Sequence, residues 1–144
     1  TWPYTRWELW SKIAIALTFT GHGLYALGLP YATPSGFFVM TQEILGLTAA
    51  QAQIFLQIAG GLDLIVLVAL FIPPLARSAL FYATFWGLVT AFARSLAFVD
   101  WEASWLENLR WLSETIVRLS HGLIPLALWF ALKRDSRPAP PEAS

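Results

Sequence analysis

Apolar residues dominate four long segments of the chain, which are separated by shorter stretches holding prolines, glycines and charged residues. The segments cover about residues 8–29, 49–72, 78–99 and 109–132. A bilayer core about 30 Å thick is crossed by roughly 20 mostly apolar helical residues, and every segment reaches that length. The pattern therefore predicts four transmembrane helices in an all-α chain.

Local signals mark the ends of these helices. The first ends just before Pro30, after a glycine, which is a typical helix stop. The second begins after Thr48, which is followed three residues later by Gln51 in the pattern of an N-terminal capping box. Residues 37–45 lie between these two helices and are apolar but too short to span a membrane. They predict a loop with a short interfacial helix.

The four predicted crossings form a single domain, an integral membrane four-helix bundle in which neighbouring helices run antiparallel. An even number of crossings places both termini on the same side of the membrane. That side holds six of the nine basic residues: Arg6, Lys12, Arg77, Lys133, Arg134 and Arg137. The positive-inside rule then predicts cytoplasmic N- and C-termini, in the cytoplasmic (inner) membrane. The proline-rich residues 135–144 predict a disordered-type tail.

Composition supports a membrane location and excludes several classes of function. Hydrophobic residues make up 57% of the chain and charged residues only 12%, whereas soluble domains carry about 25% charged residues. The balance of 9 basic and 9 acidic residues leaves no basic field for nucleic acid. The absence of cysteine excludes disulfides, thiolate metal sites and thiol catalysis. The first predicted partner is therefore the lipid bilayer.

Tryptophan is abundant and clusters where the membrane interfaces are expected. Six of the eight tryptophans lie just before, or in the first residues of, the first or the last apolar segment: Trp2, Trp7, Trp10, Trp101, Trp105 and Trp111. Amphipathic rings collect at the headgroup level, so this clustering indicates aromatic belts. Packing of these rings inside the bundle is the alternative.

Three ionisable side chains on different helices fall at one depth in the apolar segments. Counted at about 1.5 Å per residue from the cytoplasmic ends, His22 and Asp63 lie about 15 Å deep and His121 about 18 Å deep. Such groups are costly against lipid and should face the bundle interior. His22, Asp63 and His121 are therefore the candidate ligand- or cofactor-binding residues.

A second polar layer lies nearer the outer face. Glu114 and Arg118 are four residues apart on one helical face, and Arg94 belongs to the preceding helix. We expect Glu114 to pair with Arg94 or Arg118 and these supporting ion pairs to tune the site. The alternative is that all these polar groups only satisfy one another and that the nearby glycines serve only packing.

The sequence resembles the DoxX-like superfamily of small four-helix membrane proteins over roughly residues 10–132. The resemblance rests on these motifs: Gly21-His22-Gly23, Gly60-Gly61-Leu62-Asp63, the run from Trp86 to Arg94, Glu114 through Arg118, and Pro125-Leu126. It implies the four-helix architecture and a link to sulfur or quinone-coupled redox chemistry, or a place beside other membrane enzymes. Asp63 stands where that family often has Glu, and the two histidines are not a general family feature.

The leading functional prediction is a small membrane subunit of a larger respiratory or photosynthetic electron-transfer complex, without catalytic activity of its own. Protein partners are predicted from the mixed segment around Phe37-Phe38, the acidic Trp-rich loop at residues 100–105 and the proline-rich tail.

Two alternatives remain open. The first is a stand-alone redox protein that binds haem b or quinone through His22 and His121. Two imidazoles at one depth suit bis-histidine ligation of a haem iron, and Asp63 could orient one of them. A metal site formed by both histidines and Asp63 is a weaker variant of this class. The second alternative is a proton or small-molecule transport element.

Overall fold

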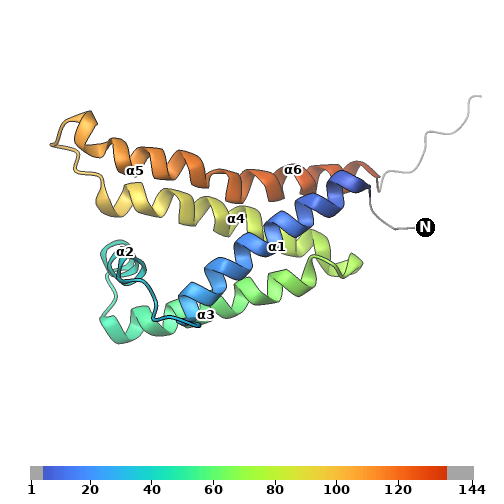
Figure 1. The fold of residues 1–144 in the computed structure, drawn as a ribbon, viewed down its shortest axis with the longest axis horizontal. Helices are drawn as coiled ribbons and strands as arrows, with labels where there is room; N and C mark the ends of the chain where they lie inside the picture. The colour runs from blue at the N-terminus through green and yellow to red at the C-terminus, as the bar shows by residue number, and fades with distance from the viewer. Residues whose placement is uncertain (1–4, 136–144) are drawn as a thin grey trace, which may run out of the picture.

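The computed structural model describes residues 5–135, and all regular structure in this range is helical (Figure 1). The helices in chain order are α1 (Arg6–Leu27), α2 (Ser35–Leu45), α3 (Ala49–Ala69), α4 (Pro73–Phe98), α5 (Trp105–Arg118) and α6 (Ser120–Asp135). The predicted all-α class is confirmed. Of the predicted tail, residues 136–144 lie outside the described residues, and Asp135 is the last residue of α6.

Three helical stretches are long and apolar enough to cross a membrane. They are α3, α4 and the nearly continuous run of α5 and α6 from Trp105 to Leu132. The first predicted crossing corresponds to α1, which has 22 residues but is not among these three stretches, and its first turns carry Arg6, Glu8 and Lys12. Four crossings and cytoplasmic termini therefore stay predictions. The start of α1 and the end of α6 do lie at one end of the bundle (Figure 1).

Capping boxes mark the first turns of α1, α3 and α5, and those of α3 and α5 bear on the predicted helix starts. The predicted capping box at the start of α3 is confirmed, because the backbone N–H of Thr48 donates to Gln51 Oε1 at 3.0 Å and Gln51 N–H donates to Thr48 Oγ1 at 3.4 Å. Ser104 and Glu107 form the same motif. This second box starts α5 at Trp105, four residues before the predicted start at residue 109.

The third long helix also begins earlier than predicted. The proline pair that follows α3 ends that helix, and it also forms the first turn of α4, which starts at Pro73 rather than near residue 78. Proline lacks the backbone N–H that the first turn of a helix leaves unused, so it fits at this position without loss. The connection between α3 and α4 is correspondingly tight.

Proline also shapes the contact between α4 and α6. Pro125 has no N–H to donate to the carbonyl oxygen of the residue four positions earlier, His121. That oxygen lies against Gly87 of α4, where a Cβ atom would be only 2.5 Å away. Gly87 therefore lets α6 approach α4 to backbone contact at this level.

The crossing of α1 and α3 is built in the same way. A Cβ on Gly23 would lie 2.9 Å from the carbonyl oxygen of Gly60, and a Cβ on Gly60 would lie 2.7 Å from that of Gly23. The bundle thus contains two helix pairs, each with one glycine-mediated crossing. Toward the turn that joins α3 to α4, the pairs enclose the packed core: Ile15, Phe19, Val66, Leu70, Leu80, Ala83 and Leu128.

Candidate ligand-binding site

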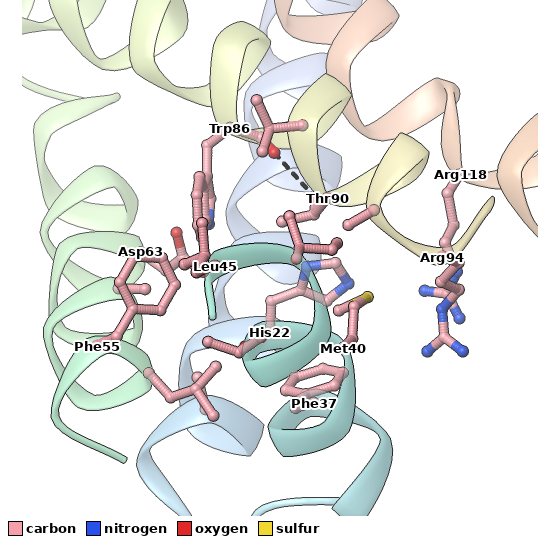
Figure 2. A pocket seen from close by; sticks show the side chains of 17 residues that line it. His22, Phe37, Met40, Leu45, Phe55, Asp63, Trp86, Thr90, Arg94 and Arg118 are labelled. Carbon is pink, nitrogen blue, oxygen red and sulfur yellow. Dashed lines mark hydrogen bonds between the residues drawn. The ribbon is translucent and has the colours of Figure 1, made fainter. Parts of the chain in front are cut away.

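The other half of the bundle contains a cavity of about 200 Å³. Its wall is mainly apolar and includes the aromatic rings of Phe37, Phe55 and Trp86 (Figure 2). The short helix α2 covers one side with Phe37 and four further residues, so the predicted interfacial segment is part of the site. Phe37 and Phe38, around which a protein contact was predicted, are half-buried because α2 packs against α3 and α4.

The two histidines meet, as their shared depth predicts. The ring centroids of His22 and His121 are 5.0 Å apart and the rings stand at 86° to each other. His22 lines the cavity, whereas His121 lines a separate, more open pocket together with Glu114 and Arg118. His121 Nδ1 is buried, and within residues 5–135 it has no hydrogen-bond partner.

Asp63 joins His22 in the wall of the cavity but not in a hydrogen bond. Its side chain is almost fully buried, at 2% exposure, and its Oδ1 accepts a hydrogen bond from the Tyr82 hydroxyl at 3.2 Å. Across the described part of the chain, no hydrogen bond joins Asp63 to either histidine. Of the three predicted site residues, His22 contacts His121. His22 and Asp63 both line the cavity without contacting each other through a hydrogen bond.

The contact between the imidazoles bears on haem binding. Two axial histidines stand on opposite faces of a haem, with the iron and its macrocycle between them. Here the two rings touch edge to face, so a haem could enter only if α1 and α6 moved apart. Among the described residues, no group of three or more His, Cys, Asp or Glu is placed to hold a metal ion. Haem ligation by His22 and His121 stays a prediction.

The predicted ion pair of Glu114 is present and larger than expected. Glu114 Oε2 lies 2.9 Å from Arg94 Nη1 and 3.8 Å from Arg118 Nη2. Its Oε1 lies 3.5 Å from Nε of Arg110, which the sequence had not singled out. Arg94 and Arg118 also line the cavity (Figure 2), so the outer polar layer and the ligand-sized space form one site.

Tyr82 and the aromatic wall were missed from the sequence. The Trp86 ring lies 6.1 Å from Phe55 and 6.5 Å from Tyr82, measured between ring centroids. Tyr82 and Trp86 are four residues apart on α4, the spacing that places two side chains on one helical face. That spacing was a usable signal, but it did not reveal that this face looks toward Asp63.

Comparisons with protein family models, curated proteins and solved structures give no match to this chain. The resemblance to the DoxX-like superfamily therefore stays a prediction.

Proposed function

We propose that this chain is a multi-pass membrane protein that binds a quinone-type ligand in the cavity beside His22. The observation that carries the proposal is the cavity of about 200 Å³, lined mainly by aromatic and aliphatic side chains, with an imidazole in its wall. A cavity of roughly 150 Å³ holds one benzene molecule. The space therefore suits a compact head group of one substituted ring, or a slim pair of fused rings.

The polar groups of the wall match the two ends of such a head group. Quinone carbonyl oxygens accept hydrogen bonds, and His22, Arg94 and Arg118 are donors. Asp63 is a carboxyl group that accepts from Tyr82 and has capacity left for a ligand hydroxyl. Phe55 and Trp86 present ring surfaces against which a flat molecule can stack.

A quinone is favoured over haem because it needs no space between the two imidazoles, which are already in contact. A quinone site also agrees with the prediction of a subunit in a respiratory or photosynthetic electron-transfer complex of the cytoplasmic membrane. That assignment, the protein partners it requires and the transport alternative remain predictions. The apolar surfaces of the helices are explained by lipid alone.

Ligand binding can be tested directly on the purified protein in mild detergent. Menadione, a methyl-substituted naphthoquinone, should quench tryptophan fluorescence in a saturable way, because Trp86 lies in the cavity wall. The chain has no cysteine, so the quinone cannot react covalently with a thiol and mimic binding. Isothermal calorimetry in the same detergent separates binding from partitioning into micelles.

Two neighbouring positions on α3 provide a matched pair of variants. Ala59 lines the cavity and is 7% exposed, so Ala59→Phe should fill the space and weaken menadione binding roughly tenfold or more. Ile58 is 61% exposed and lies outside the cavity, so Ile58→Phe should bind like the unmodified protein. Ala93→Leu fills the cavity from α4 and serves if Ala59→Phe unfolds. Unchanged binding in both filled variants would refute the site.

A further inference from the structure

The charged end of the cavity contains more positive than negative charge. Arg94, Arg110 and Arg118 all converge on one carboxylate, Glu114. Arg94 and Arg118 reach the same oxygen atom, Oε2, and only Arg94 does so at hydrogen-bond distance, 2.9 Å. In residues 5–135, the 3.8 Å pair with Glu114 is the one salt bridge of Arg118. Most of its N–H donors thus have no acceptor among the described residues.

The other acid of the cavity does not compensate this charge. Asp63 is engaged by Tyr82, and Figure 2 shows Asp63 and the two arginines on opposite sides of His22. The guanidinium side chains of Arg94 and Arg118 are only 21% and 29% exposed. Cationic groups in the apolar part of a membrane protein are costly unless they are paired.

We infer that the ligand carries an anionic oxygen group, an ionised hydroxyl or a carboxylate on its ring, which Arg94 and Arg118 hold. This inference rests on the proposed quinone-type ligand and specifies its class. Guanidinium groups form strong, directional hydrogen bonds to anionic oxygens. Two of them beside an apolar, aromatic cavity select an acidic quinone over a neutral quinone of the same size.

Two commercial naphthoquinones differ in the required property. Lawsone carries a hydroxyl group that is ionised at neutral pH, whereas menadione carries a methyl group at the same ring position and is neutral. Their sizes are nearly equal, so a difference in affinity reports the charge. We expect lawsone to bind roughly tenfold or more tightly than menadione to the purified protein at neutral pH in an uncharged detergent.

Three arginine substitutions locate the effect. Arg118→Gln and Arg94→Gln should each lower the affinity for lawsone several-fold and lower that for menadione much less, because glutamine can still donate to a neutral carbonyl oxygen but carries no charge. Arg110→Gln is the matched control, because Arg110 contacts the same carboxylate but is 74% exposed and does not line the cavity. It should keep the preference for lawsone. Arg118→Lys should retain part of it, and thermal unfolding confirms that each variant is folded.

The outcomes separate this inference from the proposed function. If menadione binds as tightly as lawsone, the inference of an anionic ligand group is wrong, while the proposed quinone site is retained. If neither compound binds, the proposed function fails, and the inference fails with it. An equal loss of preference in Arg110→Gln would show a general electrostatic field instead of a contact. Displacement of lawsone but not of menadione by phosphatidylglycerol would assign the arginines to a lipid headgroup and overturn the inference.

Discussion

The two halves of the bundle differ in what they enclose. Toward the turn between α3 and α4, Leu70, Leu80, Ala83 and Leu128 have no exposed surface at all. In the other half, the helices surround a cavity and a cluster of charges. One half therefore holds the helices together, while the other tolerates empty space and unbalanced charge. Each of the two histidines immediately precedes a glycine at a helix crossing, at the boundary between the halves.

The largest effect should follow from a cavity made in the packed half. Leu80→Ala removes a fully buried side chain and should lower the free energy of unfolding by about 2–5 kcal/mol. Leu45→Ala, in a cavity-lining residue that is 47% exposed, should cost less than about 1 kcal/mol. Unfolding of both variants by denaturant in one detergent measures the difference. Equal costs would abolish the distinction between the halves.

The glycine crossings should be the next most sensitive feature. Gly87→Ala places a Cβ atom 2.5 Å from the carbonyl oxygen of His121. The overpacking should lower the free energy of unfolding by about 1–3 kcal/mol. Gly61→Ala is the control, since a Cβ there has no neighbour within 4 Å. Alanine favours helix more than glycine does, so this control should be neutral or stabilising by up to about 1 kcal/mol. Thermal unfolding should give opposite signs, and a shared sign would argue against the close crossing.

Tyr82→Phe tests the polar wall of the cavity. It removes the hydroxyl that donates to Asp63 and leaves a buried carboxyl group without that partner. The expected loss is about 1–2 kcal/mol of unfolding free energy. Tyr25→Phe, at a half-exposed tyrosine on α1, should change the stability little. If the two substitutions cost the same, the hydrogen bond contributes nothing to stability.

The smallest of these effects is expected at the ion-pair cluster. Glu114→Gln removes the carboxylate shared by three arginines, but its side chain is 28% exposed. Solvent weakens such pairs, so we expect a loss of about 1 kcal/mol and a lower melting temperature. Glu102→Gln, in the exposed loop before α5, is the control. An unchanged melting temperature for Glu114→Gln would mean that the cluster serves the ligand alone.

The sequence predicted the helices more accurately than their ends. It predicted the polar residues of the site more accurately than the aromatic residues that line the cavity. Apolar length located the long helices, and the capping pattern at Thr48 located a start to the residue. Depth counting brought His22 and His121 together because each lies within one helix, α1 or α6, and both helices were counted from the same end of the bundle. It could not reveal that Asp63 turns toward Tyr82, since helix rotation depends on packing. Nor could it show that α2 lines one side of the cavity, because a short apolar segment fits a membrane interface equally well.

The helices that could cross a membrane have unequal lengths. At about 1.5 Å per residue, α3 is about 31 Å long and the run from Trp105 to Leu132 is about 42 Å long. A hydrocarbon layer about 30 Å thick matches the first, so the second must tilt strongly or extend beyond the layer by about two turns. The exposed rings of Trp101 and Trp105 favour an extension into the headgroups. Glu114 and its arginines would then lie just beneath the surface of the bilayer, and a thicker membrane would draw them away from water.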